Sequence, residues 1–316
     1  MRIGILTRDC AGINACIRAV VRCSSYYGIE VIGINRGYDG LIDGDLKLLD
    51  RRSVSGIINL GGTILKTSRS LRFITEEGKK KAIETIIKNK IDGLIVIGGN
   101  GSLTGAYKLS KKCKIQIIGI AATIDNDING IDMSLGTDTA INVALDALDK
   151  IRDTATSLER IFVVEVMGRE CGYIALNVAL AGGCEEVLLP EKEFNIQKMC
   201  KEIYEGNKKG KKSWIIIVAE GKAKASYIAK EINRITGLET REVVLGHIQR
   251  GGRPTAFDRI LAARCGELAV KLIRENETNK CIGLKNNNLA IIDLKEAIKP
   301  KKIEVKDFYK LIKILT

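Results

Sequence analysis

The chain has 316 residues, of which 45% are hydrophobic and 28% charged. This is ordinary globular composition, and the length is typical of two domains that each bury a core. No segment reaches the roughly 18 apolar residues that a membrane helix needs. The N-terminal residues MRIGILT run straight into a strand pattern and are too short for a secretory signal. We therefore expect a cytoplasmic protein with no membrane partner.

The net charge of +13 favours partners that are anions. Proteins that bind single-stranded nucleic acid also use aromatic stacking platforms, but aromatic residues make up only 4% of this chain. Small phosphorylated ligands are therefore expected, and nucleic acid is not. The nine cysteines include no C-x-x-C pair, and there is one histidine, so we expect free thiols in the core and no zinc site.

Short β-rich apolar segments alternate with longer amphipathic segments along the chain. The predicted strands are Ile3–Thr7, Glu30–Ile34, Gly93–Ile97, Gln116–Ala121, Ile161–Met167, Glu186–Leu189, Trp214–Ala219 and Glu242–Ile248. Several are apolar throughout, as in parallel strands covered on both faces, whereas apolar residues recur at helical spacing over 141–151. This alternation predicts an α/β fold. Residues 277–288 are predicted to form a loop, and a domain boundary is expected near Gly136.

Unusual residues gather directly after five of these strands. The segments are IGGNGS, ATIDND, VMGRECG, AEGK and GHIQRGG. Ligands of open α/β sheets bind at the carboxyl ends of the strands, so we expect these loops to form a binding site. The first strand lacks the G-x-G-x-x-G of a nicotinamide-binding fold, which argues against a dehydrogenase.

Asp125 and Asp127 are the candidate catalytic carboxylates. In an extended segment their side chains would point the same way, so one could accept a proton while the other tunes it or holds a cation. The alternative is a plain turn, since Asp and Asn favour turns through local hydrogen bonds.

Arg160, Arg169, Arg241 and Arg250 lie at the ends of predicted strands. A guanidinium is a planar fork of fixed charge that suits phosphate, although each of these residues taken singly is typical of an ordinary surface. His247 lies in a glycine-rich loop beside Arg250, which favours a ligand contact over a structural role.

These segments, in this order, resemble the bacterial ATP-dependent 6-phosphofructokinases over essentially the whole chain. The matching motifs are GGTIL, TIDND, DKIRDTATS, VEVMGR, AGG, VLGHIQRGG and PTAFDR. The resemblance implies two doubly wound, Rossmann-like parallel-sheet domains with the active site between them, in a homotetramer. The nucleotide domain would comprise residues 1–136 with about 249–299, and the sugar-phosphate domain residues 137–248 with about 300–316. The reaction would convert ATP and fructose 6-phosphate to fructose 1,6-bisphosphate and ADP.

The resemblance also implies a role for individual residues. Asp125 matches the base that takes the proton of the sugar 1-hydroxyl, Thr123 and Asp127 help to position substrate and metal, and Arg69 and Arg169 stabilise the transferring phosphoryl group. The matched sugar contacts are Met167, Gly168 and Glu220, and the 6-phosphate clamp is Arg160, Arg241, His247 and Arg250, two of them from a neighbouring subunit. The matched nucleotide contacts are Tyr38, Arg69, Ser70, Gly99, Asn100, Gly101, Ser102 and Gly105. Magnesium would be held by Asp127 and, weakly, by Asn100.

A second set of residues resembles the family's effector site between subunits, for a nucleoside diphosphate or phosphoenolpyruvate. Its members are Arg18, Arg22, Arg51, Arg152, Gly183, Glu185, Lys209 and Lys211. Arg18 and Arg22 are four residues apart and would share one face of the first helix. The alternative is a solvated helix face.

The nucleotide half departs from the family pattern. Its first loop is TRDCAG, two residues short and without the family's paired glycines, so Arg8 stands where backbone would approach the nucleotide phosphates. Asn100 replaces a metal-side carboxylate. Pyrophosphate-using relatives carry Asp at position 101 and Lys at position 122; here these are Gly101 and Ala122, so ATP is the expected donor. Two hypotheses remain: an allosteric enzyme of reduced activity, or a feeble or non-catalytic paralogue that regulates a partner subunit in a hetero-oligomer.

Overall fold

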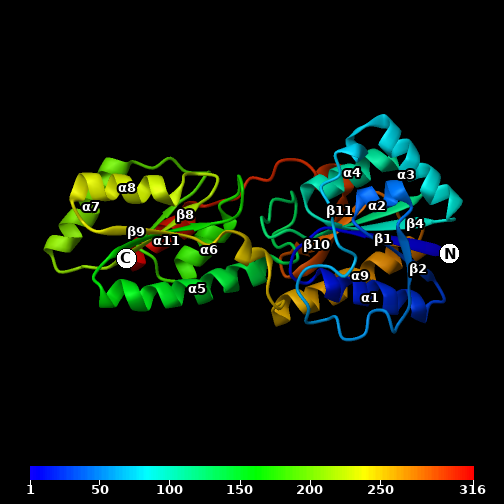
Figure 1. Cartoon of the computed structure of the whole chain (residues 1–316), viewed down its shortest axis with the longest axis horizontal. Coiled ribbons are helices and arrows are strands. Elements are labelled where there is room, and N and C mark those ends of the chain that lie inside the picture. The colour runs from blue at the N-terminus through cyan, green and yellow to red at the C-terminus, as the bar shows by residue number, and fades with distance from the viewer. The chain divides into compact units, whose positions relative to one another are not determined.

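The computed structural model describes all 316 residues and divides into two compact units. The first comprises Met1–Thr139 with Arg250–Lys301, and the second Ala140–Gln249 with Lys302–Thr316. Each is a sheet with helices on both faces (Figure 1). The predicted α/β fold class is confirmed. None of the helices combines the length and hydropathy needed to cross a bilayer.

The first unit contains a seven-stranded sheet in the order β11-β10-β5-β4-β1-β2-β3. The strands are β1 (Arg2–Thr7), β2 (Glu30–Ile34), β3 (Leu46–Leu49), β4 (Gly93–Gly98), β5 (Gln116–Ala121), β10 (Lys280–Lys285) and β11 (Asn288–Asp293). The five inner strands are parallel, whereas β3 and β11 run antiparallel at the two edges. Every residue of β4 is buried, as expected for a central strand covered on both faces.

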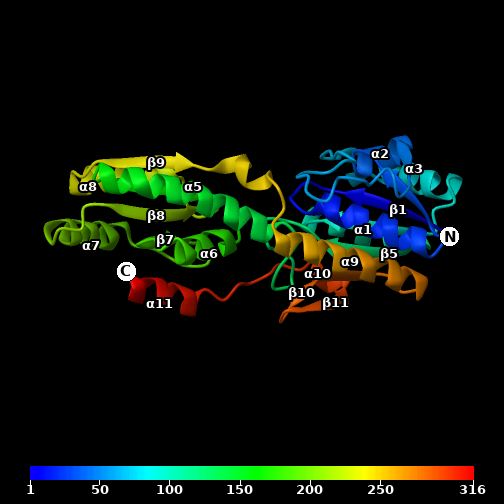
Figure 2. The same cartoon turned by 90° about the horizontal axis from the view of Figure 1, so that it is seen from below.

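Helices cover both faces of this sheet (Figure 2). On one face α1 (Ile13–Tyr26) packs against α9 (Ala256–Arg274), and a Cβ on Gly266 would lie 2.7 Å from the Cβ of Ala19. The absence of a side chain at Gly266 therefore permits this close contact. The other face carries α2 (Tyr38–Asp43), η1 (Arg72–Ile74), α3 (Glu76–Lys88), α4 (Asn100–Ser110) and α10 (Leu294–Ala297).

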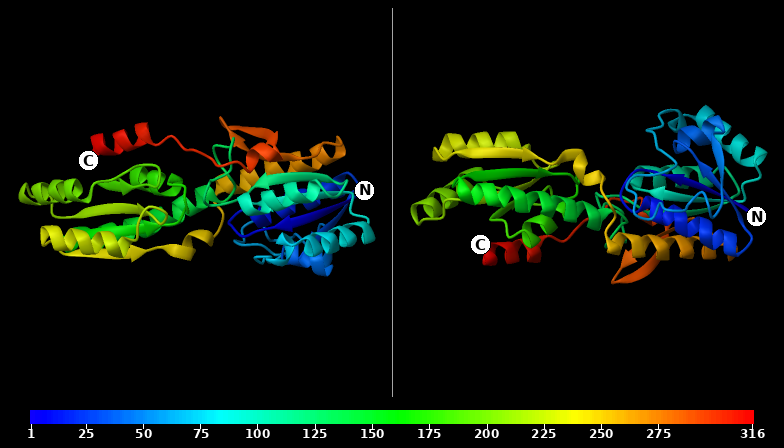
Figure 3. Two further views of the ribbon diagram at one scale, coloured as in Figure 1. Left: turned by 90° about the horizontal axis from the view of Figure 1, so that it is seen from above. Right: turned by 60° about the horizontal axis from the view of Figure 1, so that its bottom comes forward.

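The second unit contains a four-stranded, wholly parallel sheet in the order β7-β8-β6-β9 (Figure 3). Its strands are β6 (Ile161–Val166), β7 (Glu186–Leu188), β8 (Trp214–Ala219) and β9 (Thr240–Val244), with η2 (Gly246–Arg250) following β9. Its helices are α5 (Thr137–Ser157), which begins in the first unit, α6 (Tyr173–Ala181), α7 (Ile196–Lys208), α8 (Ala225–Thr236) and α11 (Lys306–Leu315). The apolar side chains of α7 and α8 form one core with one face of the sheet.

Two sequence-based expectations about the elements are wrong, and the strand predictions also missed β3 and β11. Residues 277–288 are not a loop, because they contain β10, which forms a hairpin with β11. The polar turn at Asn286 and Asn287, both with positive φ, conceals these strands in the sequence. The strand expected at 242–248 ends at Val244, since Gly246 has φ 53° and a 3₁₀ turn follows. The helix over 141–151 and the nine free cysteines are confirmed.

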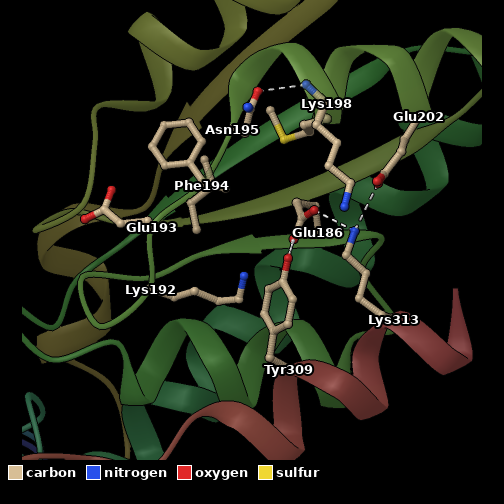
Figure 4. Close-up of a pocket in the computed structure, with 11 residues that line it drawn as sticks. Glu186, Lys192, Glu193, Phe194, Asn195, Lys198, Glu202, Tyr309 and Lys313 are labelled. Atoms are coloured by element: carbon tan, nitrogen blue, oxygen red, sulfur yellow. Dashed lines mark hydrogen bonds and ion pairs between the residues drawn. The ribbon is translucent and has the colours of Figure 1, made fainter.

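A carboxylate of β7 holds the C-terminal helix in the second unit (Figure 4). Glu186 is 6% exposed and accepts hydrogen bonds from Tyr309 Oη at 2.9 Å and Lys313 Nζ at 2.6 Å. Lys313 also contacts Glu202 of α7 at 3.3 Å. Burial opposes the charge on Lys313, but these bonds outweigh burial and raise its pKa. The stabilisation is therefore present at neutral pH and is lost only as the pH rises through that raised pKa.

We expect Lys313→Met to loosen α11, because the buried Glu186 loses its charged partner at a cost of about 1–3 kcal/mol. Hydrogen exchange of the α11 amides should accelerate by roughly tenfold or more. The matched control is Lys310→Met, which removes an exposed lysine of the same helix. Equal exchange in the two variants would contradict the anchoring role of Lys313.

Candidate active site

Three loops of the first unit emerge side by side from β1, β4 and β5. Thr7 is in register with Ile97, and Gly98 with Ala121. A Cβ on Gly99 would lie 3.1 Å from the Cβ of Thr123. The glycine loop and the acidic loop are therefore in direct contact, as the strand order predicts.

The acidic loop is a turn and not the extended segment that was expected. Asn126 is buried in the left-handed conformation with φ 52°. Its Nδ2 donates to the Asp132 carbonyl at 2.7 Å, and its Oδ1 accepts from Ser134 N at 2.9 Å. The prediction that Asp125 and Asp127 point the same way by strand alternation is therefore wrong, and the turn alternative describes the backbone correctly.

This turn carries two carboxylates on the loop whose Thr123 contacts the glycine loop. Asp125 is 3% exposed and Asp127 half-buried. Thr123 fixes the start of the turn, because its carbonyl accepts from Ser134 Oγ at 2.8 Å and Thr137 Oγ1 at 2.9 Å, and its Oγ1 accepts from Asp125 N at 3.2 Å. These bonds fix the backbone from which the Asp125 carboxylate projects, and a general base needs a fixed position.

The predicted nucleotide contacts divide into loop and core residues. Gly99, Asn100, Gly101 and Ser102 lie where β4 passes into α4. Tyr38 is instead buried: its Oη donates to the Ser102 carbonyl at 2.7 Å, and its ring fills the space beside Gly105. Burial raises the pKa of Tyr38. Tyr38 and Gly105 therefore pack against each other at the first turns of α4 and support the glycine loop.

Asp39 organises the segment that carries Arg69 and Ser70. Its carboxylate accepts from Ser68 Oγ at 2.6 Å and Ser70 Oγ at 2.5 Å, and pairs with Arg72. Burial raises the pKa of Asp39, but these hydrogen bonds outweigh burial, so the pKa lies below its usual value. Arg69 is exposed. The segment thus presents Arg69 outward while Ser70 is engaged within the protein.

The residues near these loops fit a magnesium ion that is held largely by substrate oxygens. The chain contains no group of three or more His, Cys, Asp or Glu side chains arranged so that it could hold a metal ion. Magnesium in phosphate sites commonly takes only one or two carboxylates, with waters and phosphate oxygens completing the shell. Asp127 supplies one carboxylate, and the Asn100 side chain, whose Oδ1 accepts from Thr104 Oγ1 at 3.3 Å, adds a neutral oxygen.

In the second unit, a turn after β6 brings together several predicted sugar contacts. Glu220 Oε1 accepts from Gly168 N at 3.2 Å and Arg169 N at 3.0 Å. Gln249, which is buried and was not foreseen, accepts from Met167 N at 2.8 Å. Gly168 and Arg169 both have positive φ. These bonds hold a strained turn and leave Arg169 exposed.

Two predicted clamp arginines lie at the other end of the same sheet. Arg160 precedes β6 and Arg241 lies near the start of β9, whereas Met167 and Glu220 follow their strands. Glu239 joins the two arginines, at 2.9 Å from Arg160 and 2.6 Å from Arg241. The hydrogen bond from Arg241, opposed by burial and assisted by Arg160, lowers the pKa of Glu239. Within one chain, therefore, Arg160 and Arg241 do not join the Met167–Arg169 turn. His247 is exposed in η2, and Arg250 begins the returning segment of the first unit.

The predicted effector residues are divided between the two units. In the second unit Arg152 donates to the carbonyls of Gly182 and Gly183, and Lys211 lies 3.3 Å from Glu185, whose Oε2 accepts from Ile215 N at 2.7 Å. Lys209 caps α7. In the first unit Arg18 and Arg22 are half-buried on α1, and Arg51 is exposed.

Sequence reasoning missed three buried polar residues that shape these loops. Asn14 binds the carbonyls of Leu60 and Gly61 and the N–H of Ile64. Gln249 and Asp258 are likewise buried. Gln249 lies in the motif VLGHIQRGG and Asp258 in PTAFDR. Their position as polar residues inside matched motifs was the signal that could have identified them.

Known proteins resemble the chain in sequence and in structure. The family model described as phosphofructokinase matches residues 2–273. An ATP-dependent 6-phosphofructokinase of Halothermothrix orenii is 50% identical, covering 100% of this chain and 99% of that protein. One of Clostridium tetani is 52% identical, covering 94% and 93%.

Among solved structures, phosphofructokinase from Saccharomyces cerevisiae superposes with a TM-score of 0.88 at 34% identity. The match covers 94% of this chain and 45% of the yeast chain. The chain belongs to the phosphofructokinase family, because the family model matches most of its length and relatives share about half of its residues.

Proposed function

We propose that the chain transfers the γ-phosphoryl group of ATP to the 1-hydroxyl of fructose 6-phosphate, giving fructose 1,6-bisphosphate and ADP in the cytoplasm. The observation that carries this proposal is the buried Asp125 on a rigid turn in contact with the glycine loop after β4. A proton acceptor beside a phosphate-binding backbone is the arrangement that phosphoryl transfer to a hydroxyl requires.

In this proposal, Asp125 accepts the proton as the sugar oxygen attacks. Arg69 and Arg169 neutralise charge on the phosphoryl group, since positioning and electrostatics dominate this chemistry. Asp127 and Asn100 would hold magnesium, which when bound shields the donor phosphates. Met167, Gly168 and Glu220 orient the sugar, with Gln249 and Glu220 holding the turn.

The 6-phosphate is proposed to meet His247 and Arg250 of its own chain and Arg160 and Arg241 of a neighbouring subunit in a homotetramer. The position of the Arg160–Glu239–Arg241 group at the opposite end of the sheet supports a role towards another subunit. The effector set, in the same way, is proposed to bind a nucleoside diphosphate or phosphoenolpyruvate between subunits.

A coupled assay with saturating fructose 6-phosphate and magnesium–ATP tests the activity. Turnover at about 1 per second or faster, an ordinary enzyme rate, is expected with ATP. No turnover is expected with pyrophosphate, because Gly101 and Ala122 stand where pyrophosphate-using relatives carry Asp and Lys. A rate at background together with fructose 6-phosphate binding in calorimetry would instead favour the regulatory paralogue that Arg8 and Asn100 suggest. Absence of sugar-phosphate binding to folded protein would contradict the clamp assignment.

We expect Asn100→Asp to raise kcat with magnesium–ATP, by up to about 10²-fold, because it restores a negative charge on the metal side. The neighbouring Gly101 and Ser102 are unchanged, so the glycine loop keeps its form. The measurement is steady-state turnover across a magnesium titration. No gain, in protein shown to bind nucleotide, would contradict the account of this loop.

A further inference from the structure

Arg8 lies across the end of the glycine strand, and its side chain is held there. Its N–H donates to the Ile97 carbonyl at 3.0 Å. A Cβ on Gly98 would lie 3.0 Å from Arg8 Cγ, so the aliphatic part of Arg8 occupies the space that Gly98 leaves open. Arg8 Nη1 then donates to the Ser68 carbonyl at 2.7 Å and approaches Thr67 Oγ1 at 3.4 Å. The guanidinium is therefore positioned between β4 and the segment that carries Arg69.

The charges around Arg8 also favour a bound phosphate. The first turn of α4 contains no acidic residue, and Asn100 is neutral. Arg8 is half-buried, and partial burial strengthens the attraction between a cation and a phosphate. Arginine also matches phosphate with a planar fork of N–H donors.

We propose that Arg8 is a specificity-determining residue that binds the donor's phosphates directly, so that the nucleotide binds without magnesium. This inference rests on the proposed function, which places the donor at these loops. A carboxylate at position 100 would repel a metal-free polyphosphate and would require a bridging cation. An amide at position 100 removes this one source of repulsion, with Asp125 and Asp127 remaining on the neighbouring loop, and a guanidinium at position 8 adds an attraction. Magnesium is then needed for turnover more than for binding.

Calorimetry with ATP, in EDTA and in excess magnesium, tests this on the full chain. We expect the wild-type dissociation constants in the two conditions to agree within about threefold. Arg8→Ser should weaken metal-free binding by about 10–100-fold, the value of a charged hydrogen bond, and magnesium–ATP binding by less. Arg8→Lys should restore much of the metal-free affinity, since it keeps the charge. Asn100→Asp should weaken metal-free binding while sparing magnesium–ATP.

The matched control is Lys108→Ser, which removes an exposed cation from the last turn of α4 and should leave both constants unchanged. ATP that binds only with magnesium would overturn this inference while leaving the proposed activity intact. The inference would also be overturned if Arg8→Ser, shown to be folded by a cooperative thermal transition, bound metal-free ATP as tightly as the wild type does. Absence of ATP binding in both conditions would overturn the inference and the proposed donor together.

Discussion

Asp125→Asn is expected to lower kcat by about 10²–10⁴-fold, the usual contribution of a general base. The amide has nearly the same shape as the carboxylate but does not accept the proton of the attacking hydroxyl. The turn should survive, because Asn126, Ser134 and Thr137 keep the hydrogen bonds that hold its backbone. Binding of fructose 6-phosphate should therefore change little while kcat falls.

The measurement is steady-state kinetics with both substrates varied, together with calorimetry for the sugar phosphate. Asp149→Asn is a suitable control, because it makes the same chemical change at an exposed position of α5. If Asp125→Asn retained more than about a tenth of the wild-type kcat, Asp125 would not act as the base.

The sequence was sufficient to predict the elements that have a strong pattern. The buried strands β4, β5, β6 and β8 are continuous apolar segments, and each appears within a residue or so of its expected position. The edge hairpin of β10 and β11 was missed because its turn is polar and one strand is half-exposed. Patterns of hydrophobicity report burial, so they are weakest at sheet edges.

The site residues likewise divide into features that the sequence could predict and features that it could not. The loops that carry Asp125 and Arg169 could be located because they follow predicted strands, but their backbone conformations could not. Asn126 and Arg169 adopt left-handed conformations that depend on hydrogen bonds from Ser134, eight residues further on, and to Glu220, which is distant in the sequence. The predicted strands already placed Arg160 and Arg241 at strand starts, whereas the pairing of β6 with β9, which brings these two arginines together, could not be read from a single sequence.

Asp258→Ala is expected to destabilise the first unit by about 3–6 kcal/mol, since each buried donor left without an acceptor costs about 1–3 kcal/mol. Asp258 is 0% exposed. Its carboxylate accepts from Gly136 N at 2.9 Å, from Thr139 N at 2.9 Å and from the Thr139 hydroxyl. It therefore joins the start of α9 to the start of α5, and Thr137 between these partners binds the Thr123 carbonyl of the acidic loop.

Chemical unfolding followed by circular dichroism measures this effect, with Glu267→Ala, an exposed position of the same helix, as the control. Burial, partly offset by the Thr139 bonds, raises the pKa of Asp258. A raised carboxyl pKa means that this group favours the fold most when protonated, so its contribution falls as the pH rises from the unfolded to the folded pKa. Asp258→Asn should remove that pH dependence and cost less than alanine, because its amide oxygen still accepts. An alanine variant as stable as the Glu267 control would show that α9 and the acidic loop are held by packing alone.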